Sequence, residues 1–186
     1  MSNINQWLQQ KPGEHQVPAP KDFGQIASAL CENALMDAKE QLHPLLRDAQ
    51  LDRLEERPEF VQTFKRALER RIARKLAAWY PGIEAVFQFD ETRMGNPEAW
   101  DSSIHLLVKV PRLSETVRIL GRRLDRSLVK YLGQLNWPRF QKRQSILDVQ
   151  QVTLNELRHG IGYGAMFHAV YTVPVKVWPR EKTRAM

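Results

Sequence analysis

The feature that most constrains the fold is a long alternation of side chains near the carboxyl end of the chain. From Phe167 to Val177 every second residue is apolar. Successive side chains of a strand point to opposite faces, so this alternation predicts a half-buried β-strand. Pro174 has no N–H to donate to a neighbour, which favours a position at the edge of a sheet. The apolar series is Phe167, Ala169, Tyr171, Val173, Val175 and Val177.

The other face of this strand predicts a contact with another chain. A long edge strand with large side chains on both faces is prone to aggregate when it is left open. A second subunit that covers the strand would remove this hazard. The residues predicted for such a subunit interface are Val170, Thr172, Pro174, Lys176 and Trp178. The strand therefore favours a protein that works within an oligomeric assembly.

The remaining periodicities predict an α+β fold. The expected helices are 25–50 (broken near Pro44), 58–79 and 114–135, with Ser114 as the N-cap of the last. An apolar stripe along one side predicts the second helix from Phe60 to Leu76 and the third from Val117 to Leu135. The expected strands are 83–90, 102–110, 145–153 and 164–178, and the first two are expected to form an antiparallel pair. Residues 154–162 are expected to be a turn or short helix. This order predicts N-terminal helices followed by a β-β-α-β-β, mostly antiparallel sheet, with one helix packed across it.

The length of 186 residues allows one domain with an arm. Proline and glycine in the first segment predict a flexible arm over 1–22. We expect an N-terminal helical extension over 23–56, an α+β core domain over 57–180 and a basic tail over 181–186. Cys31 is the only cysteine, which excludes an internal disulfide. No apolar run is long enough for a membrane helix, and the first ten residues do not resemble a signal peptide. Synthesis in the cytoplasm is therefore expected.

The net charge of +7 is concentrated on two predicted helices and the tail. On the helix 114–135, basic residues recur at every fourth position, with one more beside them: Arg118, Arg122, Arg123, Arg126 and Lys130. The helix 58–79 has the same spacing at Arg66, Arg70 and Arg74. Like charges four residues apart repel one another. Such a ladder is typical either of a solvated helix face or of a surface for an acidic protein or nucleic acid.

The sequence predicts no cofactor and no catalytic site. The glycines at 160, 162 and 164 lack the spacing of a dinucleotide-binding loop, and no Walker lysine follows. A hairpin connection or a β-bulge is the favoured interpretation. The five histidines have no metal-ligand spacing, although His105 and His168 lie in different predicted strands and could approach one another. We therefore expect a protein that is not an enzyme and holds no metal.

The order of elements from about Phe60 onward resembles that of the tail terminator and neck ring proteins of tailed bacteriophages and phage-like contractile systems. The matching segments are RRIARKLAAWYPGI, SIHLLVKV, SETVRILGRRLDRSLVKYLGQL and FHAVYTVPVKVW. The resemblance as a whole, from about Phe60 onward, covers roughly two thirds of the chain. The match is one of element order and alternation, and the first fifty-odd residues have no counterpart in it.

The resemblance implies a non-catalytic structural subunit of an oligomeric ring that joins the tail tube to the head connector. It implies a homo-oligomer, with other assembly proteins as partners, possible non-specific DNA contact and a place in the virion. Sheet edges and the 92–100 loop would then contact neighbouring subunits. The alternative is a small basic nucleic-acid-binding protein that uses the same two basic helices.

Overall fold

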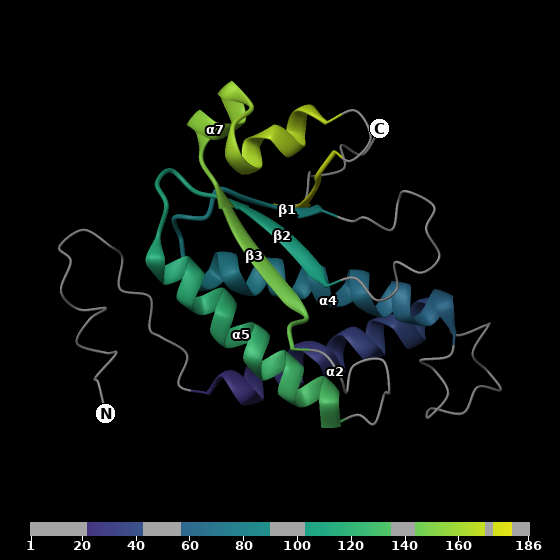
Figure 1. Cartoon of the computed structure of the whole chain (residues 1–186). Coiled ribbons are helices and arrows are strands. Elements are labelled where there is room, and N and C mark those ends of the chain that lie inside the picture. Colours follow the sequence, from purple (N-terminus) through teal and green to yellow (C-terminus); the bar gives the residue numbers. More distant parts are fainter. Residues whose placement is uncertain (1–21, 43–56, 90–102, 135–143, 170–172, 180–186) are drawn as a thin grey trace.

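The computed structural model describes residues 22–42, 57–89, 103–134, 144–169 and 173–179 (Figure 1). Its helices are α2 (Phe23–Gln41), α4 (Pro58–Trp79), α5 (Glu115–Gln134), α7 (Leu154–His159) and the 3-10 helix η4 (Gly162–His168). Its strands are β1 (Ala85–Phe89), β2 (Ile104–Lys109), β3 (Leu147–Val152) and β4 (Val175–Trp178). The α+β class is as predicted from the sequence.

The four strands form one mixed sheet in the order β3-β2-β1-β4. β1 pairs antiparallel with both β2 and β4, so the predicted pairing of the first two strands is confirmed. β3, however, runs parallel to β2 in unbroken register from Ile104↔Leu147 to Lys109↔Val152. The sheet is therefore less antiparallel than expected. The reason is that α5 connects β2 to β3 as a crossover, and a crossover returns the chain in the same direction.

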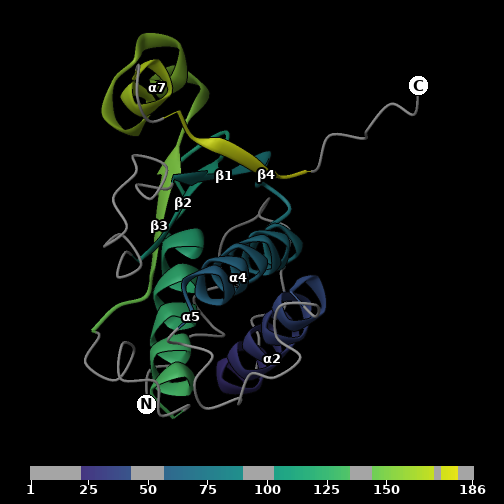
Figure 2. The same cartoon turned by 90° about the vertical axis from the view of Figure 1, so that its right-hand side faces the viewer.

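The helices α4 and α5 cover one face of the sheet, and α2 packs against both of them (Figure 2). The core lies between the helices and the sheet, and α2 contributes Ala27, Cys31, Ala34 and Ala38 to it. These small residues let α2 approach the other helices closely. The predicted N-terminal extension therefore shares one core with the predicted core domain over the residues that the structure describes.

The apolar stripes read from the sequence are the faces that the structure buries. On α4, Phe60, Phe64, Leu68, Ile72 and Leu76 are all no more than 1% exposed. On α5 the buried residues include Val117, Leu120, Leu124 and Leu128. Pro58 stands at the first turn of α4, where its missing N–H costs no helical hydrogen bond. The bounds predicted for these two helices hold to within a residue.

The prediction of one long closing strand over 164–178 is wrong. Residues 162–168 form η4, and only Val175–Trp178 form a strand; residues 170–172 lie outside the described part of the chain. The expected division of faces also fails, because Val173 is 57% exposed whereas Pro174 is buried. The edge position is confirmed, since β4 is the last strand of the sheet.

The glycine-rich run explains this failure. Gly160 ends α7 in a left-handed conformation with φ 61°, and Gly162 follows with φ 53°. Only glycine adopts these angles without strain, and the chain therefore turns sharply into η4. The run is a helix end and a tight corner, not the hairpin or bulge that we expected. Phe167 then packs its ring edge-on against Phe87 of β1, with ring centroids 4.8 Å apart.

Two glycines of α5 provide a matched test of the packing between α5 and β3. A Cβ on Gly121 would lie 2.9 Å from Cβ of Val149, whereas a Cβ on Gly133 would meet nothing within 4 Å. We expect Gly121→Ala to lower the free energy of unfolding, because overpacking costs about 1–3 kcal/mol. Gly133→Ala should raise it by about 0.5–1 kcal/mol. Denaturant unfolding measures both, and a stabilised Gly121→Ala would contradict the close approach.

Candidate partner-binding surface

The ladder on α5 lies on the exposed side of the helix. Arg118, Arg122, Arg126 and Lys130 are all exposed, and the opposite side of α5 is buried in the core. Arg118 donates hydrogen bonds to Glu115 one turn earlier. These bonds hold the pKa of Glu115 below its usual value. Arg122, Arg126 and Lys130 make no ion pair within the described part of the chain.

Arg123 does not belong to this exposed surface. It is half-buried, and its guanidinium lies 5.8 Å from the ring centroid of Phe23 on α2. A cation over an aromatic face is attracted by the negative charge of the ring surface. Arg123 therefore joins α5 to α2, although the sequence grouped it with the partner-binding residues.

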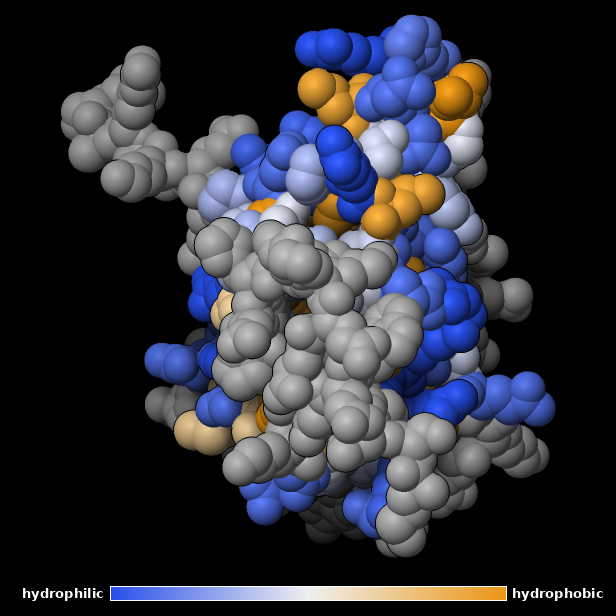
Figure 3. All heavy atoms as spheres, turned by 90° about the vertical axis from the view of Figure 1, so that its left-hand side faces the viewer, coloured by the Kyte–Doolittle hydropathy of each residue, from blue (hydrophilic) through white to orange (hydrophobic). Residues whose placement is uncertain are grey.

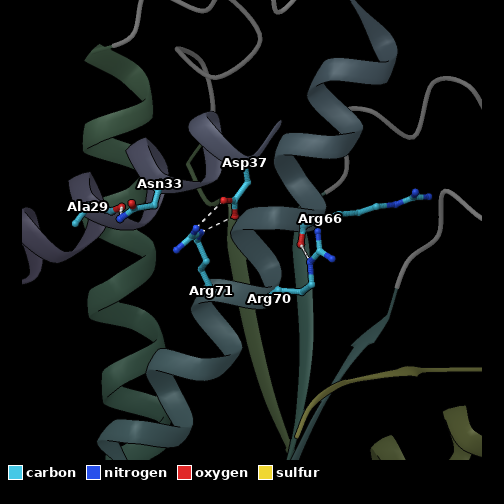
Figure 4. Close-up of polar contacts among 6 residues, drawn as sticks. All are labelled: Ala29, Asn33, Asp37, Arg66, Arg70 and Arg71. Carbon is cyan, nitrogen blue, oxygen red and sulfur yellow. Dashed lines mark hydrogen bonds and ion pairs between the residues drawn. The ribbon is translucent and has the colours of Figure 1, made fainter. Parts of the chain in front are cut away.

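The ladder on α4 is divided between surface and interface. Figure 4 shows Arg71 reaching Asp37 of α2, while Arg66 points away from this pair. Arg71 binds both carboxylate oxygens of Asp37, at 2.9 and 2.8 Å. Arg70 is half-buried and folds back to donate to the carbonyl oxygen of Arg66 at 3.1 Å.

The contact between α4 and α2 is made by Arg71, which lies beside the ladder. The hydrogen bonds from Arg71 lower the pKa of Asp37, and the charges of Arg70 and Arg74 act in the same direction. Sequence spacing missed Arg71 because it lies off the repeat of four. Of the three predicted residues on α4, Arg66 and Arg74 remain exposed. The α5 ladder is therefore the more open of the two basic surfaces.

The predicted interface on the closing strand is only partly described. Val170 and Thr172 lie outside the described residues. Pro174 is buried within the chain's own fold, and Trp178 is partly buried against the core. Lys176 is exposed. That this strand contacts another subunit stays a prediction.

His105 and His168 have different hydrogen-bond partners. His105 Nδ1 lies 3.3 Å from Oδ2 of Asp148, its register partner on β3. The hydrogen bond with His105 lowers the pKa of Asp148. His168 Nε2 lies instead 2.9 Å from the carbonyl oxygen of Leu157 on α7. Each histidine therefore has its own hydrogen-bond partner, and no hydrogen bond joins His105 to His168 among the described residues.

The single cysteine is a core residue. Cys31 is fully buried on α2, and burial raises the pKa of its thiol to about 12. The thiolate is the nucleophilic and metal-binding form, so this thiol is inert at neutral pH. Across the described ranges, no three side chains of His, Cys, Asp or Glu are grouped in a way that could hold a metal ion.

An apolar surface that the sequence did not predict lies around α7 and η4. Leu154, Ile161 and Tyr163 are 44%, 52% and 40% exposed. Figure 3 shows orange apolar side chains at this upper end of the molecule, among hydrophilic ones. The sequence does contain a signal for this surface, because Ile161 and Tyr163 stand between the glycines at 160, 162 and 164. It was missed because the run was expected to be a hairpin connection or a β-bulge, and these apolar residues were not considered as a surface.

Sequence reasoning also missed two polar residues that join α5 to β3. Asp125 Oδ1 accepts the N–H groups of Ile146 and Leu147, both at 2.8 Å. The Gln151 side chain bonds the backbone N–H and carbonyl of Ser114, again at 2.8 Å. Ser114 stands directly before α5, at the predicted N-cap position, and its carbonyl oxygen accepts the N–H of Arg118 at 3.4 Å. Its hydroxyl has no hydrogen-bond partner among the described residues, so Ser114 does not cap the helix with its side chain. Only Asp125, an acid within a basic helix, gave a signal.

No helix within the described ranges combines the length and the apolar character that crossing a membrane requires. Comparisons with protein-family models, curated proteins and solved structures found no match to this chain. Function is therefore inferred from the residues and their geometry.

Proposed function

We propose that this chain is a non-catalytic structural subunit of an oligomeric assembly that binds an acidic partner surface through the α5 ladder. The observation that carries the proposal is the exposure of Arg118, Arg122, Arg126 and Lys130 along one side of a helix whose other side is buried. Repulsion between like charges four residues apart is a cost to the helix alone. An acidic partner would convert that cost into attraction.

The assembly we propose is the neck or tail end of a phage-like particle, with the chain as a tail terminator or neck ring protein. The order α4-β1-β2-α5-β3-β4 supports this proposal, because it follows the order of the family that the sequence resembles. The insertion of α7 and η4 before the last strand is a feature of this chain. The mass of the purified protein by light scattering tests the proposal. We expect a discrete oligomer, and a stable monomer at all concentrations would contradict it.

The basic ladder gives a more specific prediction. Replacing Arg122 and Arg126 by glutamate should leave the thermal midpoint nearly unchanged, because both side chains are exposed. Binding to immobilised polyglutamate should weaken at least about tenfold, since two attractions become repulsions. The control is the double change Arg112→Glu and Arg158→Glu, which alters net charge equally at exposed positions off α5. Equal losses in both variants would show that only net charge matters.

The alternative function is the binding of nucleic acid through the same ladder. The dependence of DNA affinity on salt concentration distinguishes it from the binding of an acidic protein. Contact with six or more phosphates loses about a thousandfold in affinity between about 50 and 200 mM salt. We expect only weak DNA binding that moderate salt abolishes. Tight DNA binding at physiological salt, lost in the Arg122/Arg126 variant and kept in its control, would put the nucleic-acid function first.

A further inference from the structure

The two edges of the sheet differ in how well they resist an added strand. β4 has four residues, follows Pro174, exposes Lys176 and has an irregular register with β1. Proline, lysine and bulges are the devices by which edge strands avoid pairing. β3 has six residues, Leu147–Val152, and its register with β2 is continuous. It contains neither proline nor lysine. β3 is therefore the edge open to strand addition.

The backbone groups on the outer side of β3 follow from its pairing with β2. Ile104 N–H donates to Ile146 at 2.6 Å, and Val110 N–H donates to Val152 at 3.0 Å. Within β3, the even-numbered residues Asp148, Gln150 and Val152 therefore turn their N–H and C=O groups toward β2. The odd-numbered residues Leu147, Val149 and Gln151 turn theirs outward, because these directions alternate along a strand.

One backbone N–H group on this outer edge has a hydrogen-bond partner, and the others have none among the described residues. Asp125 accepts the N–H of Leu147. No other described residue bonds the outward N–H and C=O groups of Val149 and Gln151. The open stretch runs from Val149 to Gln151. It is long enough to pair with a short strand, since each residue of a strand spans about 3.3 Å.

One side of α5 borders this edge and makes it positive. Asp125 reaches the edge, so the side of α5 that bears Asp125 faces it. Arg122 and Arg118 lie three and seven residues before Asp125, and such spacings share one side of a helix. Arg118 is paired with Glu115, whereas the exposed Arg122 has no ion pair among the described residues. Arg122 is thus the charge available to a ligand at this edge.

We propose that the outer edge of β3, bordered by the basic side of α5, binds an extended acidic segment of a partner protein as a fifth, antiparallel strand. The inference rests on the proposed function, because it takes the partner to be acidic, and it adds where and in what form that partner binds. Backbone hydrogen bonds to Val149 and Gln151 supply affinity, as in other cases of strand addition. Antiparallel pairing is chosen because it is the more stable arrangement per residue.

The proposed pairing predicts which positions of the bound segment should be acidic. Side chains of a strand alternate, so residues paired with Val149 and Gln151 share the face of Val149, which packs toward α5 at Gly121. Glutamates at every second position would therefore all lie on the α5 side. The probe is a capped peptide, Thr-Glu-Val-Glu-Val-Glu-Thr. N-methylation of its glutamates removes the N–H groups that face β3, and N-methylation of its valines removes only those that face away.

Binding of these peptides to the full chain, followed by fluorescence anisotropy, tests the proposal. We expect N-methylation of the glutamates to weaken binding at least tenfold and N-methylation of the valines to change it less than threefold. Arg122→Glu should also weaken binding at least tenfold, and Lys176→Glu, on the other edge strand, less than twofold. Amide exchange at Val149 and Gln151 should slow when the peptide is bound.

Three other results would each contradict the strand proposal, and they differ in what they imply for the proposed function. Equal binding of the two N-methylated peptides, with loss of binding in Arg122→Glu, would mean that charge alone attracts the acidic partner. Amides of Val149 and Gln151 already protected in the free protein would show that another part of the chain or a second copy occupies the edge. No binding of any glutamate peptide, even at low salt, would refute both the strand and the acidic partner.

Discussion

Replacing Gly164 by alanine should separate η4 from α7. The added Cβ would lie 2.0 Å from the carbonyl oxygen of Glu156 and 2.2 Å from its carbonyl carbon. Both atoms belong to the backbone of α7, which cannot move aside as a flexible side chain does. Overpacking of this kind costs about 3 kcal/mol or more. Either the two helical turns part, or the segment unfolds locally.

The measurement for Gly164→Ala is amide exchange at residue 164, whose N–H donates to Ile161 at 2.9 Å. We expect this amide to exchange much faster, and the T-shaped contact between Phe167 and Phe87 to be lost. Ala165→Ser is the control, because Ala165 is the exposed neighbour of Gly164. If Gly164→Ala exchanged as slowly as the control, the close packing of α7 and η4 would be refuted.

Replacing Asp125 by alanine should detach the beginning of β3 from α5. One carboxylate oxygen accepts two backbone N–H groups, those of Ile146 and Leu147. Hydrogen bonds to a charged acceptor contribute about 1.5–3 kcal/mol each. We expect the free energy of unfolding to fall by about 3 kcal/mol in total, because the Asp125 side chain and the two N–H groups lie in a partly buried region.

Asparagine at this position provides the matched comparison. Asp125→Asn keeps an oxygen in place of Oδ1 and removes the charge, so the loss should be about half that of the alanine variant. Denaturant unfolding gives both values. Losses below about 0.5 kcal/mol in both variants, the range of ordinary surface changes, would show that solvent replaces Asp125 without cost.

Much of the fold was predictable because single elements have strong periodicity. The i, i+4 series from Phe60 to Leu76 predicts α4 with its bounds, and the same pattern predicts α5. The alternations at 83–90 and 102–110 predict β1, β2 and their antiparallel pairing. In each case the pattern lies within one element or within two strands that follow one another in the sequence.

The closing segment was not predictable from its alternation. An alternation of apolar residues shows only that successive side chains have different surroundings. A strand produces such an alternation, and so does a tight turn followed by η4. The turn depends on positive φ at Gly160 and Gly162 and on the contact between Gly164 and the backbone of α7. That contact joins two helical turns, so it exists only once both have formed.

For the candidate surface, too, some properties were predictable from the sequence and others were not. The exposure of Arg118, Arg122, Arg126 and Lys130 follows from sequence periodicity, because an amphipathic helix that buries Val117, Leu124 and Leu128 must turn its other side outward. That Arg123 and Arg71 contact α2 follows only from the way the helices pack together. The tertiary structure alone placed β3 parallel to β2 with its outer edge beside α5. These relations join residues far apart in the chain, and local periodicity contains no information about which distant elements meet.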